Sequence, residues 1–185
     1  MIDWPWKDSI RIPVDIDSCH GSWKAPLMAC ASAADGPILE IGAGDWSTPF
    51  LHHYCACSGR KLVTFEDDHH WAGRFGKLQQ SGHQLWEGEY QRLIQELAVK
   101  TKWAVVLVDG SPGHVRWKHA LALRGFATFL VVHDYSGQDC IDTFTPELLS
   151  QWPHRAEAPR PRYSPSSLVL GQQEIPKFEG MKRPC

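Results

Sequence analysis

Two short segments rich in glycine and acidic residues point to a ligand site. The segment Glu40-Ile-Gly-Ala-Gly-Asp-Trp-Ser-Thr48 follows a short apolar run, and Glu66-Asp67 ends the next apolar run. Two glycines let the backbone turn tightly and approach a ligand, and the free N–H groups at the start of a helix attract a carboxylate or a phosphate. An acid at the end of the neighbouring strand can accept hydrogen bonds from both hydroxyls of a ribose. The pair of segments therefore predicts a site for a nucleoside-containing cofactor.

A second group of polar residues follows two later apolar runs. Asp109 comes directly after residues 103–108, and His133-Asp134 comes after residues 126–132. The carboxyl ends of neighbouring parallel strands meet at one crevice, so both aspartates are expected there. Together they would bind Mg²⁺ or another divalent cation, which holds a substrate hydroxyl and lowers its pKa. Alternatively, His133 or His114 is the general base, because an imidazole takes up a proton near neutral pH, or Asp109-Gly is simply a turn.

The elements that must position these residues alternate as in an α/β protein. Short apolar runs predict strands, and segments with apolar residues at helical spacing separate them. Thr48 is expected to cap a helix that begins at Pro49. The tail, residues 153–185, is irregular and proline-rich, with a last strand near 167–170 in an antiparallel hairpin with residues near Arg155. The remaining expected strands are 37–41, 61–66, 83–86, 103–108 and 126–132, and the remaining expected helices are 24–34, 71–78, 90–97 and 114–123.

Length and composition restrict the class of protein. The 185 residues, 43% of them hydrophobic, suit one domain over residues 1–185, with residues 1–22 as an N-terminal extension that wraps it. A net charge of −2 argues against a dedicated nucleic-acid binder. There is no apolar run long enough for a membrane helix and no basic leader, and the six cysteines form no disulfide framework, so we expect a cytoplasmic protein. A second copy of the chain, the extension or the tail would close the site, so a homo-oligomer is one expectation.

The glycine segment favours one kind of cofactor. Dinucleotide enzymes prefer a third glycine where this chain has Ser47. The segment 40–48 instead resembles motif I of the class I S-adenosylmethionine-dependent methyltransferases, in the form Glu-x-Gly-x-Gly-x-x-Ser-Thr. Residues 64–71, with an acid ending the strand and a tryptophan following, are similar to the next segment of that family. Val108-Asp109-Gly110, Arg116 and His133-Asp134 resemble its small-molecule and glycan O-methyltransferases. The likeness covers roughly residues 22–135.

This resemblance implies a fold and a set of site residues. The fold would be a Rossmann-like sandwich with a seven-stranded, mostly parallel sheet in the order 3-2-1-4-5-7-6 and helices on both faces. Gly42 and Gly44 would approach the methionine part of the cofactor, Glu66 would hold the ribose, and Asp67 and Trp86 would lie near the adenine. The expected cofactor-binding residues are Glu40, Gly42, Ala43, Gly44, Asp45, Ser47, Thr48, Glu66, Asp67, Trp86 and Asp109. The expected catalytic residues are Asp109, His114, His133 and Asp134, and the expected metal ligands are Asp109 and Asp134.

Three hypotheses about function follow. The leading one is methyl transfer from S-adenosylmethionine to a hydroxyl of a small molecule or sugar; the motif expected of enzymes that methylate base or glutamine nitrogens is absent, which favours oxygen. The second is an oxidoreductase that binds NAD or a nucleotide sugar, and Ser47 counts against it. The third is a non-catalytic cofactor-binding protein, which the fold does not exclude. A hydrolase is disfavoured because no Gly-x-Ser-x-Gly elbow is present.

Overall fold

Seven strands form one sheet in the computed structural model, which describes residues 22–158 and 165–177. The order is β3-β2-β1-β4-β5-β7-β6; β1 to β5 run parallel, and β7 lies antiparallel between β5 and β6. This is the predicted order, so the fold class is confirmed. The strands are β1 Ile38–Ile41, β2 Leu62–Glu66, β3 His83–Glu87, β4 Trp103–Val108, β5 Ala127–Val132, β6 His154–Glu157 and β7 Leu168–Gly171.

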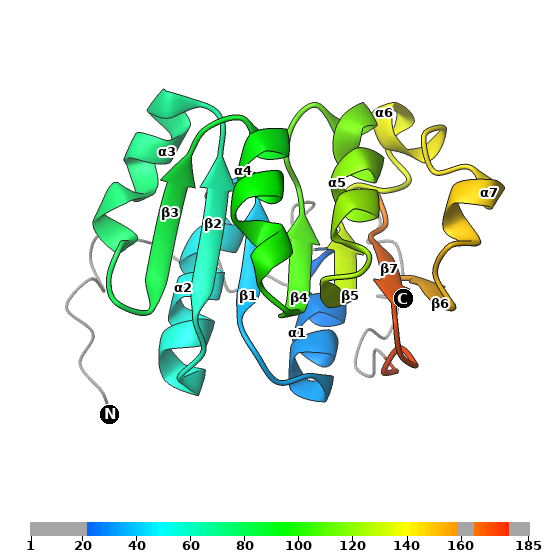
Figure 1. The fold of residues 1–185 in the computed structure, drawn as a ribbon, viewed down its shortest axis with the longest axis horizontal. Coiled ribbons are helices and arrows are strands. Elements are labelled where there is room, and N and C mark those ends of the chain that lie inside the picture. The colour runs from blue at the N-terminus through cyan, green and yellow to red at the C-terminus, as the bar shows by residue number, and fades with distance from the viewer. Residues whose placement is uncertain (1–21, 159–164, 178–185) are drawn as a thin grey trace, which may run out of the picture.

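Helices cover both faces of the sheet. Helices α4 and α5 lie in front of the sheet in Figure 1, and α1 and α2 lie behind it. The central strands β4 and β5 are therefore almost wholly buried and, apart from Thr128, carry only apolar residues, as strands covered on both faces require. The helices are α1 Lys24–Ala33, α2 Ser47–Ser58, α3 His69–Phe75, α4 Tyr90–Glu96, α5 Arg116–Leu123, α6 Gln138–Ile141 and α7 Pro146–Leu149, with 3-10 turns at Gly76–Leu78, Ala98–Lys100 and Gly113–Val115.

The element boundaries differ from expectation at the glycine segment. Helix α2 begins at Ser47, with Trp46 in the capping position, and not at Pro49. The predicted cap by Thr48 is wrong because its hydroxyl donates to Glu40 inside the protein, at 2.9 Å. By contrast, Thr145 caps α7 as its sequence suggests, accepting a hydrogen bond from the N–H of Leu148.

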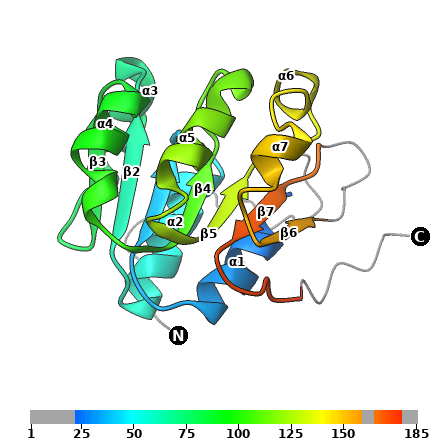
Figure 2. The ribbon, with the colours of Figure 1, turned by 45° about the vertical axis from the view of Figure 1, so that its right-hand side comes forward.

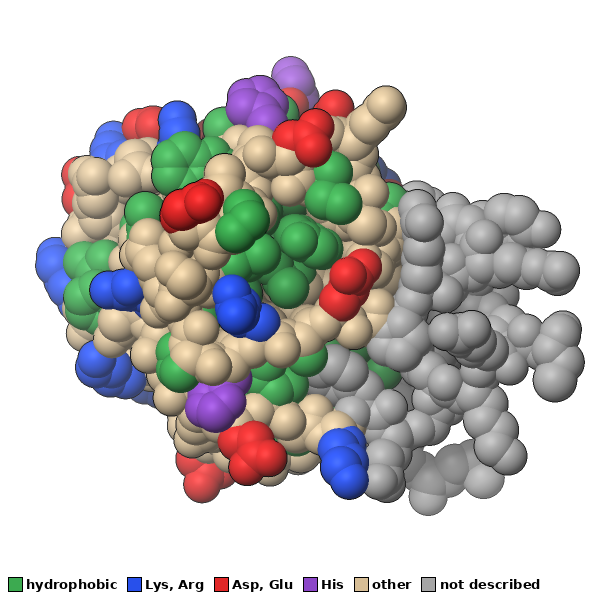
Figure 3. All heavy atoms as spheres, turned by 90° about the vertical axis from the view of Figure 1, so that its right-hand side faces the viewer, with side chains coloured by type: hydrophobic (Ala, Val, Ile, Leu, Met, Phe, Trp, Pro, Cys, Tyr) green, Lys and Arg blue, Asp and Glu red, His purple; other side chains and the backbone are tan. Residues whose placement is uncertain are grey.

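The end of the chain closes the sheet. Residues 154–157 and 168–171 form the predicted antiparallel pair at one edge, beside α6 and α7, as Figure 2 shows. The expected N-terminal wrap and the tail beyond residue 177 lie outside the described residues. Seen from the side of α6 and α7, apolar side chains gather between charged ones (Figure 3), and Ile141 at the end of α6 is 42% exposed. Among the described residues, no helix has the length and apolar character to cross a membrane.

Candidate functional site

A cavity of about 660 Å³ opens at the carboxyl edge of the sheet. This is where ligands bind in open parallel sheets, because the loops after the strands diverge on either side of the point where strand order reverses. The cavity is lined by the loop after β1, by residues after β2, β4 and β5, and by aromatic side chains at its rim. The lining residues are Trp23, Gly42, Ala43, Gly44, Asp45, Trp46, Ser47, Glu66, Asp67, Asp68, Trp71, Tyr90, Asp109, Ser111, Arg116, His133 and Asp134.

The two glycines of the first loop serve different contacts. Gly42 has a φ of +92°, and a Cβ there would lie 2.6 Å from the backbone nitrogen of Gly110, so its small size lets the ends of β1 and β4 meet. A Cβ on Gly44 would lie 2.8 Å from the Oγ of Ser47, at the first turn of α2. The first glycine therefore packs the floor of the cavity, while the second keeps the start of the helix close to the loop.

Glu66 is held by backbone donors from two loops. Its Oε2 accepts the N–H of Ala43 at 2.7 Å, and its Oε1 accepts the N–H groups of Asp67 at 3.0 Å and Asp68 at 2.9 Å. The hydroxyl of Tyr90 donates to Oε1 at 3.3 Å. Burial raises the pKa of Glu66, although the backbone donors oppose the shift. The carboxylate therefore joins the loops after β1 and β2 and is 4% exposed at the wall of the cavity.

A second cavity of about 560 Å³ adjoins the first between α4 and α5. The two cavities share Asp67, Tyr90 and Ser111 as lining residues. The rest of the second cavity is mainly apolar, with His119 buried in its wall. The Tyr90 ring lies between the two cavities. It packs edge-on against His119 on one side, and on the other it lies so close to Gly110 that a Cβ added there would be 2.9 Å from the ring.

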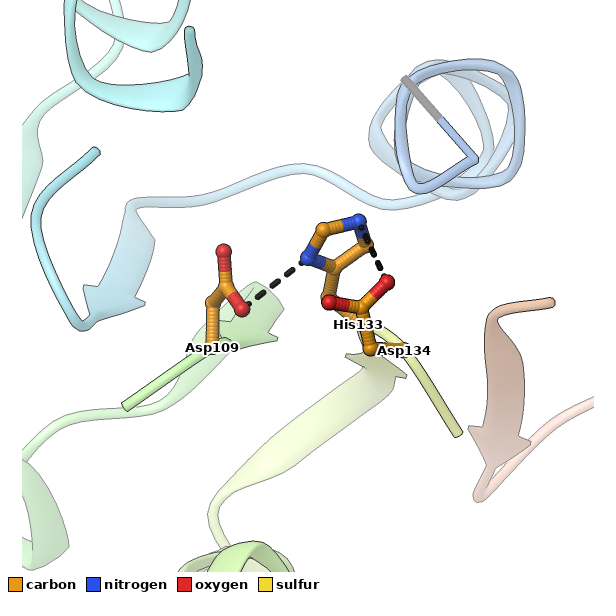
Figure 4. A group of neighbouring side chains, drawn as sticks. All are labelled: Asp109, His133 and Asp134. Carbon is orange, nitrogen blue, oxygen red and sulfur yellow. Dashed lines mark hydrogen bonds and ion pairs between the residues drawn. The ribbon is translucent and has the colours of Figure 1, made fainter. Parts of the chain in front are cut away.

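The residues after β4 and β5 form a compact polar cluster, shown in Figure 4. His133 Nδ1 lies 3.0 Å from Asp109 Oδ1, and His133 Nε2 lies 3.2 Å from Asp134 Oδ1. The His133 side chain is only 6% exposed, whereas that of Asp134 is 39% exposed. Asp134 is therefore the member of the cluster that a ligand in the cavity meets first.

Arg116 ties this cluster to the backbone. Its Nη2 lies 2.9 Å from Asp109 Oδ1, and its guanidinium also donates to the carbonyl oxygens of Asp109, Gly110 and His133. The side chain is 8% exposed. A buried guanidinium with this many acceptors is fixed in place. It balances the charge of Asp109 and holds the ends of β4 and β5 together.

The protonation of His133 follows from its neighbours. Burial works to lower the pKa of His133, but the carboxylates of Asp109 and Asp134 outweigh it and raise that pKa.

Asp134 has a φ of +50°, in the left-handed region that residues other than glycine rarely adopt, although aspartate does so more often than most. Residues in such sparsely populated backbone regions are common at functional sites.

The rim of the cavity beside the glycine loop is built from α3. Arg74 pairs with Asp45 at 2.6 Å, and its guanidinium carbon lies 4.1 Å from the centre of the Trp71 ring. The indole N–H of Trp71 donates to the carbonyl oxygen of Ala43. These contacts attach the glycine loop to α3 on its outer side, just as Glu66 attaches it on the inner side.

Four of the expected site residues lie away from the cavity. Glu40 and Thr48 are wholly buried beneath the glycine loop, because each turns toward the interior face of β1 or α2. Trp86 is 43% exposed on the edge strand β3 and lines neither cavity. His114 is exposed in a 3-10 turn, because the loop after β4 leads outward before Arg116 turns back in. Only Asp109, His133 and Asp134 of the expected catalytic residues come together.

Several lining residues were not expected. Tyr90 and Ser111 follow β3 and β4 at the same edge of the sheet as the expected residues. The rule that ligands bind at the carboxyl ends of parallel strands could therefore have identified them. Trp46 lies inside the glycine segment itself. Trp23 lies just before α1, far from the other segments in sequence, and no local signal marks it. Asp68 and Trp71 belong to the start of α3, where Asp68 caps the helix.

No protein-family model and no curated protein matches the sequence. Solved structures do resemble the fold. The O-methyltransferase of Bacillus cereus in complex with SAH is 16% identical, with a TM-score of 0.62 over 86% of this chain and 84% of that one. TomG, the Streptomyces achromogenes O-methyltransferase of tomaymycin synthesis, in complex with SAM, is 17% identical, with a TM-score of 0.60 over 84% and 81%.

A third similar structure has a different kind of role. The fibrillarin pre-rRNA processing protein of Methanococcus jannaschii is 13% identical, with a TM-score of 0.55 over 80% of this chain and 76% of that one. At such low identity these likenesses concern the fold, which this chain shares with O-methyltransferases and with a protein of pre-rRNA processing. The acceptor must therefore be argued from the site.

Proposed function

We propose that the protein transfers a methyl group from S-adenosylmethionine to a hydroxyl of a small molecule or sugar. The observation that carries this proposal is the single cavity that gathers the glycine loop, Glu66 and the cluster of Asp109, His133 and Asp134. One side of that cavity offers backbone and carboxylate groups for a nucleoside, and the other side offers groups that take up a proton. The SAM- and SAH-bound structures with the same fold support the choice of cofactor.

The cofactor would lie along the carboxyl edge of the sheet. Its methionine part would meet Gly44 and the start of α2, where the positive end of the helix dipole favours a carboxylate. Its ribose would lie against Glu66, whose Oε2 accepts only one hydrogen bond from the described residues and retains a second lone pair. Its adenine would lie beside Asp67 and Tyr90, where the second, apolar cavity begins.

The acceptor hydroxyl would lie beside Asp134. In the proposed step, the hydroxyl oxygen attacks the methyl carbon in line, the carbon–sulfur bond breaks, and S-adenosylhomocysteine leaves as a neutral thioether. The hydroxyl proton passes to the carboxylate of Asp134, the most exposed group of the cluster, whose Oδ1 lies 3.2 Å from His133 Nε2. Asp109 and Arg116 hold the imidazole from behind. Alignment and proton removal account for most of the acceleration that such a step needs from a protein.

The expected divalent cation has a poor fit to the cluster. The side chains of Asp109, His133 and Asp134 offer three ligand atoms within 4.8 Å of one another. However, Mg²⁺ prefers oxygen ligands, and one of the three is an imidazole. The same Asp109 oxygen also faces the buried guanidinium of Arg116 at 2.9 Å, which opposes a second positive charge nearby. The proposed step therefore uses no metal ion.

The two remaining hypotheses make different predictions about ligands. A dinucleotide oxidoreductase would bind NAD, whereas a non-catalytic protein would bind the cofactor without turnover. A thermal-shift assay separates the first of these, because a ligand that binds only the folded state raises its melting temperature. We expect S-adenosylhomocysteine to raise it and NAD to leave it unchanged, and the opposite result would reject methyl transfer.

Catalysis is then tested with acceptors. Purified protein is incubated with S-adenosylmethionine carrying a labelled methyl group and a panel of phenols, catechols and sugars. We expect methylation of a hydroxyl compound, and a fall of at least tenfold in Asp134→Asn with S-adenosylhomocysteine affinity retained. Binding without turnover of any acceptor in the panel would favour the non-catalytic hypothesis.

Partners and location are part of the same proposal. A small acceptor suits a cavity of this size, and we propose no nucleic-acid partner, since the net charge is −2. We propose a cytoplasmic location because the four described cysteines are free thiols, three of them buried. The homo-oligomer stays a prediction for analytical ultracentrifugation.

A further inference from the structure

A row of buried polar side chains runs beneath the glycine loop, outside the cavity. The N–H of Gly44 donates to Thr48 Oγ1 at 2.9 Å, and the Thr48 hydroxyl donates to Glu40 Oε2 at 2.9 Å. The hydroxyl of Thr64, on the neighbouring strand, donates to the same oxygen at 2.9 Å. The side chains of the row are buried completely here, with Glu40, Thr48 and Thr64 all at 0% exposure. Gly44, which lines the cavity, is thus linked by hydrogen bonds to side chains in the core.

The row continues into a pair of histidines. Thr64 Oγ1 lies 3.0 Å from His83 Nε2, and His83 Nδ1 lies 3.0 Å from His52 Nδ1. His83 is on the edge strand β3 and His52 is on α2, four residues after Thr48 and on the same helix face. The row therefore leaves α2 at Thr48, crosses three strands and returns to α2 at His52. It fixes the helix that begins at the glycine loop to the sheet.

The direction of each hydrogen bond follows from the groups present. The Thr48 hydroxyl receives the Gly44 N–H and gives its own hydrogen to Glu40. The Thr64 hydroxyl also gives its hydrogen to Glu40 Oε2, so with that oxygen as acceptor Thr64 accepts from His83, which then carries its proton on Nε2. A neutral imidazole protonated on Nε2 has an acceptor at Nδ1, so His52 must donate from its own Nδ1. The reverse tautomers require the Glu40 carboxyl group to donate to Thr64 and Thr64 to donate to His83 Nε2.

We propose that His83 and His52 are positioning residues for the cofactor, which through Thr64, Glu40 and Thr48 hold Gly44 and the start of α2 in the position that binds it. This inference rests on the proposed function. Its physical basis is that buried hydrogen bonds in series support one another in a low-dielectric interior. A break in the middle of the row leaves Glu40 with one donor fewer and His83 without its acceptor.

The first test breaks the row at Thr64 without changing its shape. Thr64→Val is isosteric, and we expect it to weaken S-adenosylhomocysteine binding about tenfold in isothermal titration, whereas Thr64→Ser restores the hydroxyl and the affinity. The matched control is Ser167→Ala, which removes an equally buried hydroxyl that is bonded at 3.0 Å to Ser22 and is not part of the row. We expect the control to lose stability but to keep its affinity. Equal affinity in wild type and Thr64→Val would overturn the proposal.

The second test needs no cofactor. Nitrogen-15 spectra of the imidazole rings distinguish the two neutral tautomers, and the variants His52→Gln and His83→Gln assign the signals. We expect His83 protonated on Nε2 and His52 on Nδ1, with the His83 preference lost in Thr64→Val. The opposite tautomers in the wild-type protein would overturn the row as described. If wild type binds no S-adenosylhomocysteine, the proposed function fails, while these spectra still decide the row.

Discussion

Replacement of Glu66 by glutamine tests the hydrogen bonds by which this carboxylate joins the loops after β1 and β2, where we propose that the cofactor binds. The carboxylate accepts one backbone N–H at Oε2, from Ala43, and two at Oε1, from Asp67 and Asp68. An amide has one oxygen and one NH₂ group, so Glu66→Gln keeps the two donors only by turning its NH₂ group toward Ala43. The new NH₂ group and the N–H of Ala43 are both donors, and they would face each other across the 2.7 Å that now separates the Ala43 nitrogen from Glu66 Oε2.

The expected loss follows from that one contact. A hydrogen bond to a charged group contributes about 1.5–3 kcal/mol, and a buried donor left without an acceptor costs a similar amount. Glu66 is only 4% exposed, so little water reaches this contact to replace the lost partner. We expect the free energy of unfolding of Glu66→Gln to fall by about 2–3 kcal/mol, and its S-adenosylhomocysteine affinity to fall about tenfold as the glycine loop shifts.

Urea denaturation at pH 7 and isothermal titration measure these two quantities. The matched control is Glu87→Gln. Glu87 is paired with Glu66 in the register of β2 and β3, but its side chain is 48% exposed. We expect the control to change stability by less than about 0.5 kcal/mol. If Glu66→Gln is as stable as wild type, the carboxyl is already protonated in the folded protein, and the account of these hydrogen bonds is refuted.

Further predictions concern the floor of the cavity, acid stability and the cation. Gly42→Ala should lose about 2 kcal/mol or more because its Cβ meets backbone, whereas Gly59→Ala, at a φ of +68° in open space, should lose about 1 kcal/mol; equal losses in urea would refute the clash. Burial lowers the pKa of His83 and of His119 to about 4, so each unfolded imidazole binds more protons below pH 6.5 and costs about 2 kcal/mol of stability at pH 5. The raised pKa values of Glu40 and Glu66 act in the opposite direction, so the check is the difference in urea stability between wild type and His119→Gln, which should change by about that amount between pH 8 and pH 5; a difference independent of pH would refute it. Magnesium titrated into wild type and Asp134→Asn should give identical heats, and a saturating isotherm confined to wild type would restore the metal site.

Strand ends were predictable because their signals are local. The apolar runs of β4 and β5 end at Asp109 and at His133, and parallel strands bring such ends to one edge whatever the rest of the chain does. The same rule located Glu66 at the end of β2. The sheet order came from the resemblance in the glycine segment rather than from periodicity, which does not say which strands are neighbours.

The direction of single side chains was not predictable. Glu40 lies two residues before Gly42 and was expected in the cofactor site, yet its carboxyl group points into the core and has a pKa raised by burial to about 8, although the neighbouring hydroxyls of Ser47, Thr64 and Thr48 oppose the shift. A buried carboxyl group is stable only with donors, and these come from β2 and α2. Their arrival depends on packing between elements, which the sequence around Glu40 does not contain.

The sequence by itself determined the sheet edge at which chemistry can occur and most of the residues on it, because strands, turns and glycine loops obey short-range rules. Tertiary structure alone decided what those residues can do. Arg116 reaches Asp109 only because α5 packs beside β4 and β5, and that contact sets the charge of the cluster. The His52–His83 pair likewise exists only because α2 lies across the edge of the sheet. Charge balance and hydrogen-bond direction depend on distances between side chains that are remote in sequence, and folding alone sets those distances.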